Sequence, residues 1–257
     1  MTSRAGRSRW RTYVPACLLF VAGLVIWELW VRVGDVPKYI LPSVSNIGIE
    51  LSEQGWSLFG HLRWTMLEAS LGFLVGSAAA FLAAVTFVHF RFVEGALLPW
   101  AIVLQTIPIV AIAPLLTIWF GFTLVPKVVI AAIICFFPVL VNTTRGLRSI
   151  SPQALELMSV LTAGRVSVFW RLRLPSSLPY VFSGLRIAST LSVIGAIVAE
   201  FTGADRGIGY VIIQASYRLD TERLFAGLVL SSAGGIAFFV LIGILEKATI
   251  RWPGART

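Results

Sequence analysis

Few residues in this 257-residue chain could take part in chemistry, and several of them interrupt long apolar stretches. Gln105 lies in the middle of such a stretch close to Pro108, and Glu200 ends another. A proline removes one backbone donor, so a carbonyl left unpaired there can face a cavity. If lipid surrounds these stretches, a central charge costs roughly 2.5–3.5 kcal/mol, and polar residues mark solute pathways by default. Gln105, Pro108 and Glu200 are therefore candidates for a translocation path; the alternatives are an interhelical hydrogen bond for Gln105 and a helix anchor for Glu200.

The residues that usually carry catalysis or bind metals are sparse. His61 and His89 lie far apart and have no cluster of cysteines or carboxylates beside them, so neither a metal site nor a nucleophile with its base is indicated. Cys17 and Cys135 lie inside apolar segments, where a small buried apolar residue is the usual role. The phosphate-loop pattern Gly-x-x-x-x-Gly-Lys-Ser/Thr does not occur in the sequence. We therefore expect no enzyme activity, metal or bound cofactor.

The composition explains why such residues are rare. The chain is 57% hydrophobic and 13% charged, with a mean hydropathy of +0.86, whereas an average soluble domain is about 45–50% apolar and about 25% charged. Lipid is therefore the expected solvent, and a helix needs about 20 apolar residues to cross it. Six such segments occur, at about 15–31, 65–88, 94–119, 126–141, 179–201 and 224–246.

The segments are apolar on every face, whereas a membrane barrel is made of strands of alternating polarity. The predicted fold is therefore all-α, a polytopic membrane bundle of six transmembrane helices. The third segment is long enough to tilt or to break.

Two hypotheses can explain the formal net charge of +9. A basic chain can bind nucleic acid, or its Lys and Arg can follow the positive-inside rule. The rule accounts for the distribution when both termini are cytoplasmic. Basic residues then gather on the cytoplasmic side, in a tail at 1–14 and a loop at 142–178. In the external segment at 32–64, acidic residues balance the basic residues of the same segment. We expect one multi-pass domain over 1–257 in a bacterial inner membrane, with the lipid bilayer as a partner and no nucleic acid.

The loop at 142–178 is long for a compact bundle, and such loops are usually functional. Ser151 and Pro152 predict the start of a short helix with a serine N-cap. Gly164 breaks the pattern, and a second apolar stripe at 166–172 ends before Pro175. A helix pair with exposed apolar positions can dock a partner. The alternative is an amphipathic pair that rests on lipid headgroups.

Glu156 to Met158, Thr162 and Pro175 have a spacing that is similar to a known signature. In ABC importer permeases, a cytoplasmic Glu-Ala-Ala is followed by three residues, Gly, nine residues, Ile, one residue and Leu-Pro. Thr162 takes the place of the glycine and Pro175 the last place, while both alanines and the glycine itself are replaced. Gly164 lies two residues further on and can still supply the break.

Further stretches resemble the nitrate/sulfonate/taurine branch of these permeases, in the same order along the chain. They occur at 39–47, 107–116, 119–122, 136–138, 184–187, 199–201 and 207–210. The resemblance covers about residues 40–243, which is most of the chain.

This resemblance implies the permease subunit of an ATP-driven importer. Such a subunit forms the translocation path as a homodimer, receives its solute from an external substrate-binding protein or lipoprotein, and docks ABC ATPase subunits on its cytoplasmic loop. ATP and Mg²⁺ would bind to that separate ATPase. The residues implied in coupling to the ATPase are Glu156, Met158, Thr162, Gly164, Phe169 and Pro175, with Leu155, Val166 and Val168 as further apolar contacts.

The resemblance implies a nitrate-like, sulfonate-like or taurine-like anion, or a vitamin precursor such as a pyrimidine or a flavin, as the solute. The few fixed charges in the apolar segments do not exclude a neutral heteroaromatic compound. The alternative function is an ion-coupled secondary transporter, which should carry acidic residues deep in the membrane and often an internal repeat. The candidate acids of this sequence lie near the segment ends, and no internal repeat is seen.

Overall fold

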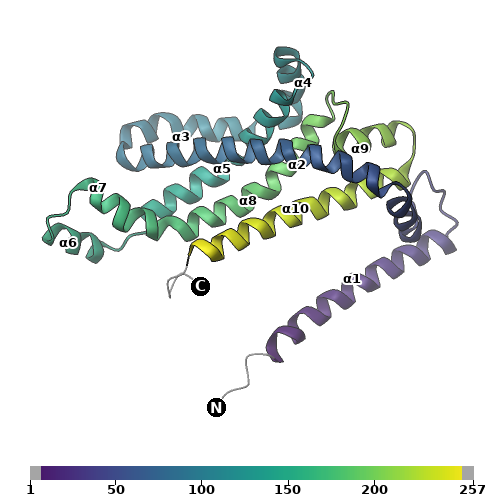
Figure 1. Cartoon of the computed structure of the whole chain (residues 1–257), viewed down its shortest axis with the longest axis horizontal. Coiled ribbons are helices and arrows are strands. Elements are labelled where there is room, and N and C mark those ends of the chain that lie inside the picture. Colours follow the sequence, from purple (N-terminus) through teal and green to yellow (C-terminus); the bar gives the residue numbers. More distant parts are fainter. Residues whose placement is uncertain (1–6, 251–257) are drawn as a thin grey trace. The chain divides into compact units, whose positions relative to one another are not determined.

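The computed structural model describes residues 7–250 (Figure 1), so residues 1–6 of the expected tail at 1–14 lie outside the described residues. The described chain is helical and contains no strand, which confirms the all-α prediction. The helices, in order, are α1 (Arg7–Val33), α2 (Val44–His89), α3 (Arg91–Thr106), α4 (Ile109–Phe120), α5 (Leu124–Arg148), α6 (Pro152–Val160), α7 (Arg165–Val168), a π-helix (Phe169–Arg173), α8 (Leu174–Glu200), α9 (Ile208–Tyr217) and α10 (Thr221–Thr249).

The described helices provide enough apolar length for a polytopic membrane protein. Five are long and apolar enough to cross a membrane, and α3 with α4 forms a sixth candidate span that is bent by 96°. The polytopic helical fold is therefore confirmed, and the long third segment does break.

The largest difference from the expected elements is α2. The sequence predicts a short capped helix within 32–64 and a separate span from Thr65, whereas one helix runs through both. The serine cap is present, because the Asn46 backbone N–H donates to Ser43 Oγ at 3.3 Å. The helix contains no proline, and an isolated glycine costs only about 1 kcal/mol, so no residue in this stretch stops it.

The chain divides into two compact units, one of residues 1–59 and 211–229 and the other of residues 60–210 and 230–257. In the first unit, Glu28 of α1 accepts from the Ser45 hydroxyl at 2.8 Å and from the Ser45 backbone N–H at 3.1 Å, and it pairs with Arg32 at 2.6 Å. Trp27 Nε1 donates to the Pro42 carbonyl at 3.1 Å. These contacts fasten the start of α2 to the end of α1.

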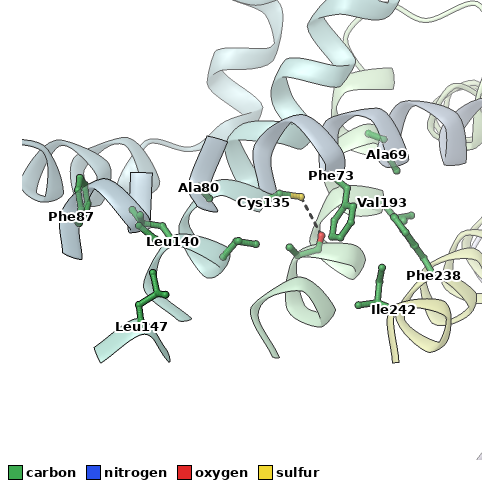
Figure 2. Packing of buried hydrophobic residues seen from close by; sticks show 14 residues of the cluster. Ala69, Phe73, Ala80, Phe87, Cys135, Leu140, Leu147, Val193, Phe238 and Ile242 are labelled. Carbon is green, nitrogen blue, oxygen red and sulfur yellow. Dashed lines mark hydrogen bonds between the residues drawn. The ribbon is translucent and has the colours of Figure 1, made fainter. Parts of the chain in front are cut away.

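The second unit holds the main core, in which α2, α5, α8 and α10 contribute the buried side chains (Figure 2). Phe73 packs edge to face on Phe238, with ring centroids 5.1 Å apart. The Cys135 thiol donates to the Ala188 carbonyl at 3.2 Å, so the cysteine is a buried structural residue. Gly184 lets α8 approach α5 closely, because a Cβ there would lie 3.1 Å from the Pro138 carbonyl oxygen. Close packing of small residues is the usual means by which membrane helices associate.

Candidate functional site

The span formed by α3 and α4 is interrupted at two extended residues. Ile107 has φ −72° and ψ 126°, and Pro108 has φ −60° and ψ 115°. The cause is local, since proline lacks the N–H that a helix needs and disfavours helical geometry in the residue before it. Beyond the break, Ala113 and Leu116 of α4 pack against α5 and α8, so the bend is held by tertiary contacts.

Gln105, in the last turn before this break, borders a cavity of about 380 Å³ formed by α2, α3 and α5. Its amide is the one polar side chain in the lining, which otherwise consists of apolar residues and Gly76. A cavity of this size and character is typical of a small-molecule site. Pro108 lies at the adjacent break and Glu200 is not part of the lining, so the structure brings only Gln105 of the three candidates directly to the cavity.

Glu200 has the geometry of a helix anchor. Its side chain is 1% exposed and accepts from Thr65 Oγ1 at 2.7 Å and from the Gly209 backbone N–H in the first turn of α9. Thr65 in turn accepts from the Ile208 N–H at 2.8 Å. The carboxylate thus satisfies donors at the start of α9, which would otherwise be unpaired in a buried place. Gly207 is required beside it, because it has φ +107° and a Cβ there would overlap the carboxylate.

A buried ion pair adjoins this anchor. Lys127 Nζ lies 3.2 Å from Glu68 Oε1, and the two side chains are 7% and 1% exposed. The role of Lys127 could not be predicted from the sequence, because an acid and a lysine near the ends of different segments carry no signal of pairing.

The loop between α5 and α8 begins as the sequence predicts. Ser151 Oγ accepts from the Ala154 N–H at 3.3 Å, with Pro152 in the first turn of α6. The helix ends in a Schellman motif, in which the Ala163 N–H donates to the Met158 carbonyl at 3.0 Å and the Thr162 N–H to the Ser159 carbonyl at 2.9 Å.

The left-handed residue in this motif is Thr162, with φ +50°. The expected break at Gly164 has a different geometry, because Gly164 has φ −63° and open space where a Cβ would lie. Thr162 occupies the glycine place of the signature, and a β-branched residue in the left-handed region is strained. The left-handed turn at the end of α6 therefore forms although the β-branched side chain of Thr162 disfavours it.

We expect Thr162→Gly to stabilise the chain by about 1 kcal/mol, because glycine adopts the left-handed region without the penalty that other residues meet there. In a thermal melt of the purified chain in detergent, the midpoint should rise by about 2–4 °C. Gly164→Ala is the matched control and should leave the midpoint unchanged or slightly higher. A lower midpoint for Thr162→Gly together with a large loss for Gly164→Ala would place the strained residue at Gly164 instead.

The second half of the loop does not end at Pro175, which corrects the sequence prediction. A π-helix runs from Phe169 to Arg173 and leads directly into α8, and the Leu174 N–H donates to the Phe169 carbonyl five residues earlier. A proline near a helix start needs no backbone donor. A proline ring obstructs the hydrogen bond between residues four apart in an α-helix. The π-helix before Pro175 replaces this pattern with hydrogen bonds between residues five apart.

The structure divides the expected coupling residues into two groups. Glu156, Thr162 and Gly164 are exposed, whereas Met158, Phe169 and Pro175 are half-buried. Phe169 packs against the core of the second unit, with its ring 5.5 Å from that of His89. The large apolar side chains that face outward are mostly not those implied by the signature. We call them the coupling patch: Leu157, Val160, Leu161, Val166 and Trp170.

Comparison with known proteins identifies the kind of molecule to which this geometry belongs. Residues 72–251 match the family described as binding-protein-dependent transport system inner membrane component. The formylaminopyrimidine transport permease ThiX of Halalkalibacterium halodurans is 36% identical over 91% of this chain and 94% of its own length. The riboflavin transport system permease RibX of Chloroflexus aurantiacus is 34% identical over 94% and 90%. The putative aliphatic sulfonates transport permease SsuC of Bacillus subtilis is 30% identical over 97% and 91%.

The match covers most of the chain and includes the broken span, the buried anchor and the loop between α5 and α8. The family consists of transport components, so the chain is a transport subunit and not an enzyme. It belongs to the binding-protein-dependent transport system inner membrane components and is the translocation subunit of an ABC importer, a multi-pass protein of the inner membrane.

Proposed function

We propose that this subunit imports a small solute along the cavity beside Gln105, with the break at Pro108 opening and closing the path. The observation that carries this proposal is the position of an apolar cavity of about 380 Å³ directly before a 96° bend in a membrane span. Irregular backbone within a membrane is tolerated where it is buried or lines a cavity. Glu200 acts indirectly, by holding the start of α9 through its hydrogen bond to Gly209.

The solute that suits this lining is a neutral heteroaromatic compound, such as a pyrimidine or a flavin. The Gln105 side-chain amide can both donate and accept hydrogen bonds. The lining contains no charged side chain that could neutralise the charge of a sulfonate or a nitrate. The names of two relatives, a formylaminopyrimidine permease and a riboflavin permease, support the same class. An external binding protein or lipoprotein delivers the solute.

The coupling patch binds the ATPase subunit, which holds ATP and Mg²⁺. Val160 is 78% exposed, Val166 72% and Trp170 63%, although each is apolar. Exposed apolar side chains gathered on one loop are typical of an interaction surface, and this loop carries the spacing of the permease signature. Both termini and the loop then lie in the cytoplasm, and a second copy of the chain completes the translocation path.

We expect the double substitution Val160→Ser and Trp170→Ser to release the ATPase. Truncating an interface tryptophan costs about 2 kcal/mol or more, and each 1.4 kcal/mol lowers the affinity about tenfold. The native chain, expressed with its ATPase subunit and purified in detergent, should retain the ATPase in a fixed stoichiometry measured by mass. The double variant should lose at least about nine tenths of it.

Trp56→Ser is the matched control, because Trp56 is 89% exposed but belongs to the first part of α2. It should retain the ATPase fully. Full retention by a folded double variant would remove the coupling patch as the docking site, and equal loss of the ATPase from the Trp56→Ser control would do the same.

A further inference from the structure

A second cavity, of about 370 Å³, lies where the end of α2 meets the loop between α5 and α8. Two of its lining residues are arginines, one is a histidine and none is acidic. The lining consists of Val88, His89, Ala163, Arg165, Val168 and Arg173.

The two arginines in this cavity differ from other arginines of the same unit. Among the residues that the structure describes, neither Arg165 nor Arg173 forms an ion pair, although Arg173 donates to the Leu147 carbonyl at 3.3 Å. Other arginines of the same unit are paired, since Arg148 lies 2.5 Å from Glu94 and Arg186 lies 2.6 Å from Glu246. Two guanidinium groups that face one cavity leave several donors for an oxyanion, which they would bind with charge-assisted hydrogen bonds.

The cavity lies at the ends of two helical stretches that are long and apolar enough to cross a membrane. His89 is the last residue of one apolar span, and Arg165 is the first residue of another. Hydrocarbon gives way to headgroups near the ends of membrane helices, and the lining includes the apolar side chains of Val88 and Val168 as well as the two arginines. The His89 ring is held in place, with Nδ1 2.8 Å from the Val85 carbonyl oxygen, and His89 belongs to the lining.

We propose that this cavity binds the phosphodiester group of an anionic phospholipid. Arg165 and Arg173 donate to its oxygens, and Val88 and Val168 contact the start of its acyl chains. Basic pockets between membrane helices are a recurrent means of binding anionic headgroups. The bound lipid connects the end of α2 to the loop that carries the coupling patch. Inorganic phosphate has the same oxyanion chemistry, so the experiment must separate the two sources.

The test uses the full chain alone, purified in a neutral detergent without the ATPase, so that its result does not depend on the proposed docking site. Micellar phosphatidylglycerol, phosphatidylcholine and inorganic phosphate are titrated separately, and the thermal midpoint is recorded. We expect phosphatidylglycerol alone to raise the midpoint. Arg165→Gln should weaken its apparent affinity about fivefold, since one arginine near an anionic surface contributes roughly that factor.

Arg165 is exposed and its side chain forms no ion pair within residues 7–250, so Arg165→Gln should fold normally. Arg173→Gln provides the second variant, and Arg171→Gln is the matched control because Arg171 is exposed and not part of the lining. Arg165→Lys should recover part of the affinity. An equal response to phosphatidylcholine, or a response to phosphatidylglycerol that neither Arg165→Gln nor Arg173→Gln weakens, overturns the site. If inorganic phosphate alone raises the thermal midpoint as much as phosphatidylglycerol does, the bound oxyanion is phosphate and not a lipid headgroup.

Discussion

Replacing Lys127 by methionine is expected to destabilise this permease by about 3–5 kcal/mol, the usual cost of removing one partner from a buried ion pair. Lys127 lies 3.2 Å from Glu68, and both side chains are almost fully buried. Without the ammonium group, Glu68 would be left as an uncompensated carboxylate close to Glu200. A thermal melt in detergent, followed by the fraction of chain that remains monodisperse on a sizing column, measures the loss.

Two further variants show whether charge causes the effect. In the Lys127→Met background, Glu68→Gln removes the uncompensated charge and should recover at least half of the lost stability. Lys38→Met is the surface control, because Lys38 is paired with Glu222 at 3.4 Å but is 76% exposed, and such pairs contribute about 0–1 kcal/mol. A Lys127→Met chain that melts at the native temperature would show that Lys127 and Glu68 do not form a buried pair in the membrane.

The features that the sequence predicted well are those set by neighbouring residues. Apolar length alone identified the membrane spans, and the break in the third segment follows from Pro108, which acts on its own backbone and on the residue before it. The cap at Ser151 is equally local, since the hydroxyl and the N–H of Ala154 are three residues apart.

The features that the sequence did not predict depend on contacts between distant segments. The role of Glu200 depends on Thr65, which is 135 residues away in the sequence. It also depends on the start of α9, which the turn at Gly207 brings back to the Glu200 side chain. The sequence therefore left two roles open for Glu200, a solute path and a helix anchor, and the hydrogen bonds in the structure are those of an anchor. Lys127 was missed for the same reason, because its partner belongs to another helix.

The coupling patch shows a different limit. Helix α6 has apolar residues on more than one face, so periodicity alone cannot tell which of them turns toward the bundle. Met158 is half-buried and Leu157, its neighbour, is 61% exposed. At the start of the π-helix, Phe169 packs inward and its neighbour Trp170 is exposed. A π-helix has no sequence signal comparable to a proline or a glycine cap. The sequence therefore could not predict which residues of this loop face outward.

Gly76→Ala is expected to be the second strongly destabilising substitution, with a cost of about 3 kcal/mol from overpacking. A Cβ at this position would lie 2.4 Å from the Ala132 carbonyl oxygen and 2.9 Å from its Cα, and both are backbone atoms that cannot rotate away. Helices α2 and α5 would therefore have to separate beside the cavity that Gly76 lines. Gly60→Ala, in the same helix, meets no atom within 4 Å and should stabilise the chain by about 0.5–1 kcal/mol. Thermal midpoints of the two variants measure this contrast, and equal midpoints would mean that α2 and α5 do not pack this closely in the native bundle.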